Sequence, residues 1–119
     1  MEIKTKRVYE AAENTDGIRI LIDKFWPRGI RKDDLKYDIW VKNISPSDRL
    51  GKLLHENPEA NWDAFVKGYL EELNKSSDYA DFINKLKGLR ASTVTLLYSF
   101  KDTLRNHANV LKMAIEKDL

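Results

Sequence analysis

One stretch of the chain, Ser92–Phe100 with the sequence STVTLLYSF, constrains the fold more than any other. Its β-branched and aromatic residues favour a strand, and the apolar residues at its centre run continuously instead of alternating with polar ones. An alternating strand buries one face, whereas a continuous apolar run is buried on both faces, as in an inner strand of an α/β sheet. The stretch therefore predicts an inner strand with other structure packed on both sides of it.

Three earlier segments are candidate strands. Ile3–Tyr9 and Ile18–Asp23 are rich in Ile and Val, and the polar segment between them closes on Asp16-Gly17, a dipeptide typical of turns. Tyr37–Ile44 is a weaker candidate, which fits either a short strand or a single helical turn. Together with Ser92–Phe100, these segments predict a small sheet.

Capping residues followed by proline mark two helix starts. Ser45 is followed by Pro46 and, three residues on, by Asp48, which is the arrangement of a capping box. Asn57 before Pro58 repeats the device. We therefore expect one helix to begin at Ser45 and the next at Asn57.

Apolar residues at helical spacing predict three amphipathic helices. Their apolar faces are Trp62, Phe65, Val66, Tyr69, Leu70 and Leu73; then Tyr79, Phe82, Ile83 and Leu86, ended by Gly88; then Leu104, Ala108, Leu111, Ala114 and Ile115. Strands interleaved with helices predict an α/β fold, in which a small sheet, largely parallel or mixed, has helices packed on it. The length of 119 residues suits one domain spanning residues 1–119.

Composition limits the classes of function. The formal net charge is only +2, which argues against a dedicated nucleic-acid binder, although KTKR and RGIRK are locally basic. The chain has no cysteine, so disulfides, thiolate zinc sites and a cysteine nucleophile are excluded. The first residues lack the apolar core of a signal peptide, and no segment has the apolar length of a membrane helix. We expect a cytoplasmic protein, and the sequence leaves open whether it forms a homo-oligomer.

Two polar clusters follow predicted strands. The first, Asp23–Asp34 (DKFWPRGIRKDD), comes after Ile18–Asp23, and the second, Tyr98–His107, comes at the end of Ser92–Phe100. If these strands are parallel, both clusters lie at the carboxyl edge of the sheet, where open α/β sheets bind their ligands. The sequence then predicts one site built from both clusters.

In the first cluster, Pro27 and Gly29 predict a stiff turn around Arg28, because proline fixes its own φ and glycine permits a positive φ. A guanidinium held in this way suits a carboxylate or a phosphate. Alternatively, Arg28 pairs with Asp33 or Asp34 of the same segment. Asp23 either caps the turn or acts in the site. Trp26 either packs on the core or forms a pocket wall.

In the second cluster, Asp102 is an N-cap candidate for the last helix, and Lys101 and Asn106 near a helix N-terminus would suit an anion. His107 falls on the inward face of that helix, where it is either a buried packing residue or a site residue. The other histidine, His55, is expected at the surface. Two histidines this far apart make a poor metal site, and no cofactor-binding motif is present, so no metal is predicted and any cofactor is unknown.

Several strings of this chain resemble the bacterial and archaeal family DUF488, in particular its YeaO-like branch. They are RVYE, DGIRILIDKFWPRGIRKDDLKYDIWVKNISPS and VTLLYSFKDTLRNHANVL, and together they cover most of the chain. The resemblance implies a small cytoplasmic α/β protein without an established activity. By position, the family motif marks Asp23, Trp26, Pro27, Arg28, Gly29, Trp40, Pro46, Ser47, Tyr98, Lys101, Asp102, Asn106 and His107. Arg105 stands where the family often has a second histidine, which weakens any scheme that needs paired imidazoles.

Two hypotheses of function follow. In the first, the protein binds, and as an enzyme also transforms, a small anionic ligand that is phosphorylated or carboxylated. The ligand-binding residues would be Trp26, Arg28, Ser47, Tyr98, Lys101 and Asn106, and the catalytic residues Asp23, Asp102 and His107. In the second, the protein is a non-enzymatic interaction module, whose polar residues form a buried structural network and whose aromatic face around Trp26 and Trp40 engages a partner. Arg28→Ala and Asp23→Ala would lower stability markedly only in the second.

Overall fold

The computed structural model of the protein describes all residues from Met1 to Leu119. Four strands form one sheet: β1 (Glu2–Arg7), β2 (Ile18–Leu21), β3 (Ile39–Trp40) and β4 (Thr93–Tyr98). Their order is β1-β4-β2-β3, and every neighbouring pair is parallel. The α/β class is confirmed, and the sheet is fully parallel.

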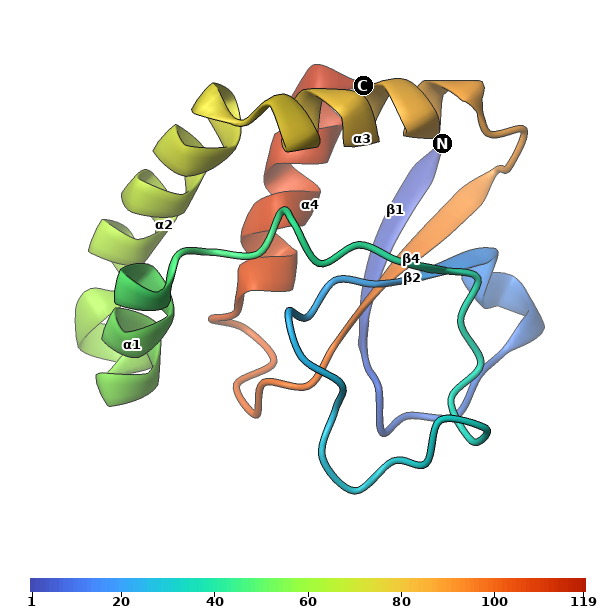
Figure 1. Cartoon of the computed structure of the whole chain (residues 1–119), viewed down its shortest axis with the longest axis horizontal. Helices are drawn as coiled ribbons and strands as arrows, with labels where there is room; N and C mark the ends of the chain where they lie inside the picture. Colours follow the sequence, from blue (N-terminus) through green and yellow to red (C-terminus); the bar gives the residue numbers. More distant parts are fainter.

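Four α-helices accompany the sheet: α1 (Asp48–Glu56), α2 (Pro58–Lys75), α3 (Ser77–Gly88) and α4 (His107–Asp118). A short 3₁₀ helix, η1 (Asn14–Asp16), precedes β2. Helices α1 and α2 lie side by side at one end of the molecule, away from the strands, and α3 and α4 connect them to the sheet (Figure 1). None of these helices combines the length and the hydrophobicity needed to cross a membrane.

Strand β4 is an inner strand, as its apolar centre predicts. Val94–Tyr98 is fully buried, and the side chains alternate between two cores. The main core lies on the helix side of the sheet and includes Val94, Leu96 and Tyr98. The smaller core lies on the other side and consists of Val8, Leu21, Leu35 and Leu97.

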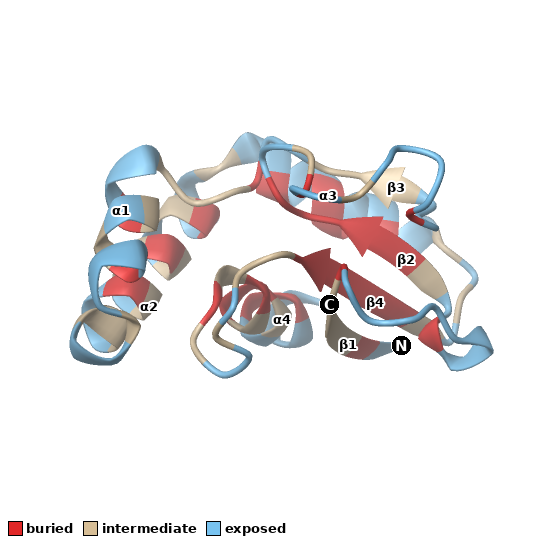
Figure 2. Cartoon of the chain, turned by 90° about the horizontal axis from the view of Figure 1, so that it is seen from below, coloured by how far each residue is buried: buried red, intermediate tan, exposed pale blue.

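The two faces of the sheet are covered in different ways. The main core joins the sheet to the helices, through apolar side chains such as Phe65 and Tyr69 of α2. The smaller core is covered by the long segment between β2 and β3, from which Leu35 packs on the sheet and Trp26 and Ile30 pack against it. This segment runs across the face of β2 (Figure 2). The loop that carries the first polar cluster is therefore also a structural layer.

Helix α1 begins later than the sequence predicts. Its N-cap is Ser47, whose Oγ accepts a hydrogen bond from the amide of Leu50, and not Ser45. The Oγ of Ser45 instead donates to the carbonyl oxygens of Ile22 and Lys42, which fixes the preceding loop. The Asn57 cap and the N1 position of Pro58 are confirmed for α2.

Helix α4 also begins later than predicted. Its N-cap is Asn106, whose Oδ1 accepts from the amide of Asn109, so α4 starts at His107. Asp102 closes the preceding turn, because its Oδ1 accepts from the amides of Leu104 and Arg105. Leu104 therefore lies outside the helix and is 72% exposed, contrary to its predicted place on the apolar face. Helix α3 also differs slightly, since Gly88 is its last residue and Leu89 is the C-cap.

A buried ionic network that the sequence analysis did not predict lies beside η1. The carboxylate of Asp16, which is 3% exposed, pairs with Lys6 of β1 at 3.0 Å and with Arg19 of β2 at 2.5 Å. Burial alone would raise the pKa of Asp16, but hydrogen bonds from Glu13, Lys6 and Arg19 outweigh it, and the pKa is lowered. The network ties two strands that are not neighbours in the sheet, so we interpret it as structural.

Candidate functional site

A cleft of about 1110 Å³ lies at the carboxyl ends of β1, β2 and β4, between these strand ends and helix α1. The arrowheads of β2 and β4 point toward the end of the molecule that holds α1 and α2 (Figure 2). Because the strands are parallel, the two polar clusters meet there, as the sequence analysis predicts for this case. Seven of the predicted site residues line the cleft: Asp23, Trp26, Arg28, Ser47, Lys101, Asp102 and His107.

Asp23 and His107 both line the cleft and contact each other. Oδ1 of Asp23 lies 2.8 Å from Nε2 of His107. Oδ2 accepts two hydrogen bonds from Ser99, from the amide at 3.0 Å and from Oγ at 2.6 Å. One carboxylate, which is 9% exposed, thus joins the end of β2 to the loop after β4 and to the first residue of α4.

Asp23 is held as an anion. Burial would raise the pKa of this carboxyl, but the hydrogen bond and the charge of His107, together with the hydrogen bonds from Ser99, lower it below its usual range. Both carboxylate oxygens already have partners, so Asp23 orients His107 and the loop after β4. The other imidazole nitrogen of His107, Nδ1, forms no hydrogen bond within the protein. Since no buried side-chain nitrogen or oxygen is unsatisfied, Nδ1 is accessible to solvent.

Arg7, at the end of β1, is a cleft residue that the sequence analysis missed. Its Nε donates to the carbonyl oxygen of Phe100 at 3.0 Å and its Nη2 to that of Ser99 at 2.7 Å. The guanidinium also stacks on the ring of Tyr9, 4.8 Å from the ring centre. It forms no ion pair, so its charge is not neutralised by any carboxylate. Its place at the end of a predicted strand is the one sequence signal that could have identified it.

Arg28 is exposed at the tip of the loop after β2 and forms no ion pair, so the alternative in which it pairs with Asp33 or Asp34 is wrong. Its backbone is fixed, because the carbonyl oxygen of Arg28 accepts from the hydroxyl of Tyr9 at 2.9 Å. Gly29 has a φ of 77°, which confirms the predicted positive φ. The turn therefore presents the Arg28 side chain to solvent and to the cleft.

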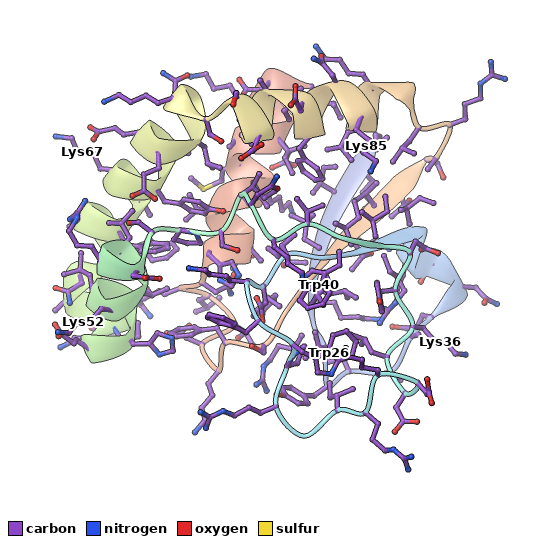
Figure 3. The ribbon with its side chains drawn as sticks, in the orientation of Figure 1. Trp26, Lys36, Trp40, Lys52, Lys67 and Lys85 are labelled. Atoms are coloured by element: carbon purple, nitrogen blue, oxygen red, sulfur yellow. The ribbon has the colours of Figure 1, made fainter.

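Trp26 both packs on the small core and lines the cleft. Its ring meets Trp40 edge-on at 5.5 Å and Tyr37 at 5.7 Å, and its Nε1 donates to the carbonyl oxygen of Ile30. The Nε1 of Trp40 donates to the backbone oxygen of Asp23 at 2.7 Å. Figure 3 shows Trp26 and Trp40 close together beneath the loop. Both rings are half-buried, so they anchor the backbone that carries Asp23.

The loop after β4 contributes Lys101 and Asp102. Lys101 is exposed and forms no ion pair. Hydrogen bonds from the amides of Arg105 and Leu104 lower the pKa of Asp102, which is therefore an anion engaged in the turn. Lys101 is thus a cation without a partner in the cleft, whereas the charge of Asp102 is satisfied by backbone donors.

Three other predicted site residues have clear structural partners. Ser47 lines the cleft, but its Oγ caps α1. Tyr98 and Asn106 are buried and do not line it. The ring of Tyr98 meets the imidazole of His107 edge-on at 6.4 Å, and Nδ2 of Asn106 donates to the carbonyl oxygen of Asp102 at 3.0 Å. These last two residues support the cleft from behind.

Helix α1 forms the opposite wall of the cleft. Lys52 and His55 are exposed on it, as was expected for His55, and the imidazole of His55 meets the ring of Phe100 edge-on at 4.9 Å. Lys24 pairs with Asp48 at 3.3 Å, but both side chains are solvent-exposed, so this pair is weak. The sequence around His55 does not mark it as a site residue, since nothing local shows which face of α1 lines the cleft.

The cleft carries more positive than negative charge. Its basic residues are Arg7, Lys24, Arg28, Lys52 and Lys101, and its acidic residues are Asp23, Asp48 and Asp102. Two of the three acids, Asp23 and Asp102, accept hydrogen bonds from the protein, and the third pairs with Lys24. No group of three or more side chains that could hold a metal ion is present. The arrangement therefore suits a negatively charged ligand.

Comparison with known proteins places the chain among relatives of similar length. The "Uncharacterized protein YeaO" of Escherichia coli K12 is 44% identical over 115 residues, which cover 93% of this chain and 94% of the relative. The "Uncharacterized protein Rv3073c" of Mycobacterium tuberculosis H37Rv is 41% identical over 109 residues, covering 92% and 89%. No solved structure matches the chain significantly. A family profile described as "Inactive DUF488-N3 subclade" matches residues 2–119, and the chain therefore belongs to this subclade of the DUF488 family.

Proposed function

We propose that the protein binds a small anionic ligand of the cytoplasm, phosphorylated or carboxylated, in the cleft at the carboxyl ends of the strands. One observation carries the proposal. Four basic side chains of the cleft, those of Arg7, Arg28, Lys52 and Lys101, form no ion pair, whereas its acidic side chains all have partners. A concave surface with unpaired cations from several elements attracts anions and concentrates them.

Arg7 is the part of this cleft best prepared to bind. Its guanidinium is held by two carbonyl oxygens and by the ring of Tyr9, so little side-chain freedom remains to be lost on binding. Two carbonyl acceptors do not use all five donors of an arginine, and the remaining donors suit a carboxylate or a phosphate oxygen. The side chains of Arg28 and Lys101 are exposed and form no ion pair, and they would contact the ligand from the two loops.

We propose ligand binding as the main function and catalysis only as a secondary one. The description of the subclade as inactive supports a protein that holds its ligand without transforming it. Asp23 and Asp102 are both anions with hydrogen-bonded oxygens, which favours orienting roles for them over proton transfer. His107, the third residue proposed as catalytic, differs from them because one of its ring nitrogens, Nδ1, has no partner in the protein and is open to solvent.

A thermal-shift screen of the wild-type protein against phosphorylated metabolites and small carboxylates tests the proposal, with Arg28→Ala in parallel. A ligand at about 100 times its dissociation constant stabilises the folded protein by about 2.7 kcal/mol, enough to raise the melting temperature measurably. We expect at least one hit, weakened in Arg28→Ala. If no anion stabilises the wild-type protein, the proposed function is wrong.

A second candidate function, the non-enzymatic interaction module, rests on one exposed ring. Phe25 is 74% exposed at the rim of the cleft, with the amine of Lys24 5.6 Å from its ring centre. Aromatic residues are enriched in protein–protein interfaces, so this ring suits contact with a partner protein or with a second copy. Analytical ultracentrifugation of the wild type and of Phe25→Ser tests self-association: a dimer that the substitution abolishes would favour this function.

A further inference from the structure

We propose that His107 makes anion binding in the cleft depend on pH: its Nδ1 donates to a ligand oxyanion when the imidazole is protonated and repels that oxyanion when the imidazole is neutral. This inference rests on the proposed function, since it names the residue that would make anion binding in the cleft depend on pH. It assigns His107 as a ligand-binding residue and requires no chemical step.

The tautomer of His107 follows from its partner. A carboxylate only accepts hydrogen bonds, so the nitrogen that faces Oδ1 of Asp23, Nε2 at 2.8 Å, must carry a hydrogen. In a neutral imidazole the other nitrogen, Nδ1, then has a lone pair and no hydrogen. Asp23 cannot turn away to allow the other tautomer, because its Oδ2 is held by the amide and the Oγ of Ser99.

Nδ1 of His107 is the ring nitrogen that remains available to a ligand. It has no partner in the protein, it is accessible to solvent, and His107 lines the cleft. The ring itself is fixed: its side chain is only 14% exposed and it stands edge-on to Tyr98. A ligand in the cleft therefore meets either a lone pair or an N–H at this position, according to the protonation of His107.

The charged and titratable groups around His107 come from every element that borders it. Asp23 follows β2, Arg7 ends β1, and α1 contributes the wall opposite. Asp23 and Tyr98 contact His107 directly, and the other charged or titratable side chains of the cleft are Arg7, Tyr9, Lys24, Arg28, Asp48, Lys52, His55, Lys101 and Asp102. A bound oxyanion favours the protonated imidazole, so binding and protonation of His107 assist each other.

The sign of the pH dependence follows directly. Binding of a fully ionised oxyanion is tightest at acidic pH, where His107 is protonated, and weakens as the pH rises and the proton is lost. Sulfate is the suitable probe because it stays fully ionised throughout this range, so its own titration cannot mimic the effect. Losing one charge-assisted hydrogen bond and the attached charge should weaken sulfate binding about tenfold.

The experiment is an NMR titration of the protein with sodium sulfate at several values between about pH 5.5 and about pH 8.5, a range that spans the usual titration of imidazole. Sodium chloride keeps the ionic strength constant. The variants His107→Gln and His55→Gln remove the two histidines one at a time. In the wild-type protein, the imidazole ¹⁵N signals of His107 report its protonation directly, which keeps the test valid if His107→Gln folds poorly.

Each outcome has a definite meaning. We expect sulfate binding to weaken with rising pH in the wild type, to be independent of pH in His107→Gln, and to shift the titration of His107 toward higher pH. Sulfate binding with the same dissociation constant at all pH values would refute the inference and leave the proposed function standing. A pH dependence lost in His55→Gln and kept in His107→Gln would assign the effect to the wrong side of the cleft and also refute it. No binding of sulfate at any pH would count against the proposed function itself.

Discussion

Nε2 of His107, in the first residue of helix α4, lies 2.8 Å from Oδ1 of Asp23, which follows strand β2 84 positions earlier in the chain. The same carboxylate accepts two hydrogen bonds from Ser99 after strand β4. Three segments that are distant in sequence therefore meet at one carboxyl group. Because these segments form the floor of the cleft, the stability of the fold and the geometry of the candidate site depend on the same contacts.

Asp23→Ala should destabilise the protein under either hypothesis of function, because Asp23 lines the cleft and also joins three segments of the fold. The substitution leaves His107 and the Ser99 donors without their acceptor, and breaking a pair this buried costs about 3 kcal/mol. Urea denaturation measures the loss. Asp33→Ala is the matched control, because Asp33 is exposed in the same loop and forms no ion pair, so its effect should stay within about 0.5 kcal/mol. Equal effects of the two substitutions would show that the Asp23–His107 contact is not structural.

Arg28→Ala should leave stability unchanged and weaken anion binding, because the side chain is exposed and unpaired. Arg7→Ala, in contrast, should both destabilise the protein and weaken anion binding. It removes two hydrogen bonds to the carbonyl oxygens of Ser99 and Phe100, which we expect to cost about 2 kcal/mol. Melting temperatures and ligand titrations of the two variants separate these effects. A large drop in the melting temperature of Arg28→Ala would instead support the interaction-module hypothesis, in which Arg28 belongs to a structural network.

Acid should weaken the folded state through Asp16 and Asp23. Both carboxyls have a lower pKa in the folded chain than the ordinary value of 3.8. The folded protein thus binds fewer protons than the unfolded chain, and the stability from these groups is complete above about pH 5 and lost as the pH falls through 3.8 toward the folded pKa.

Asp16→Asn offers a direct check of this sign. The variant should be less stable than wild type at neutral pH, and the difference in the free energy of unfolding should shrink as the pH falls below about 4. The same network also contains Lys6, whose pKa is raised above 10.5 by its contacts with Glu13 and Asp16. The stability that the charged Lys6 contributes is therefore complete below about pH 10.5 and is lost as the pH rises from there through the folded pKa. A difference between Asp16→Asn and wild type that stays constant from neutral to acidic pH would contradict the account.

The two glycines with positive φ should respond differently to alanine. A Cβ at Gly17 would collide with the carbonyl oxygen of Thr93 in β4, in addition to the strain of a φ of 64°. At Gly29, with a φ of 77°, a Cβ would meet no atom within 4 Å. Gly29→Ala should therefore cost about 1 kcal/mol from backbone strain, and Gly17→Ala clearly more. Equal losses of stability in thermal unfolding would show that the contact with Thr93 relaxes freely.

Much of the fold could be predicted because its signals are local. The apolar centre of β4 and the apolar face of α2 each depend on neighbouring residues only, and both patterns match the observed burial. The starts of α1 and α4 were misplaced for a physical reason. In each case two capping residues lie a few positions apart, Ser45 and Ser47 or Asp102 and Asn106, and tertiary contacts decide which one caps the helix.

The edge that carries the site was predictable, whereas some of its residues were not. Parallel strands bring their carboxyl ends together, so Asp23 and His107 could be assigned to one place before their contact was known. The guanidinium of Arg7 donates to backbone carbonyl oxygens, and Ser99 donates to Asp23 from its amide and its Oγ, and no sequence pattern marks these contacts. His55 lines the cleft only because α1, far away in the sequence from the strand ends, forms the opposite wall.

The central claim is that the cleft at the carboxyl ends of β1, β2 and β4 is a site for small anions, and NMR mapping of the tightest ligand from the thermal-shift screen tests it most directly. We predict that the amide signals that shift belong to the loop after β2, around Arg28, and to the loop after β4, from Ser99 to Asp102. Shifts confined to the ionic network of Lys6, Asp16 and Arg19, outside the cleft, would contradict the claim.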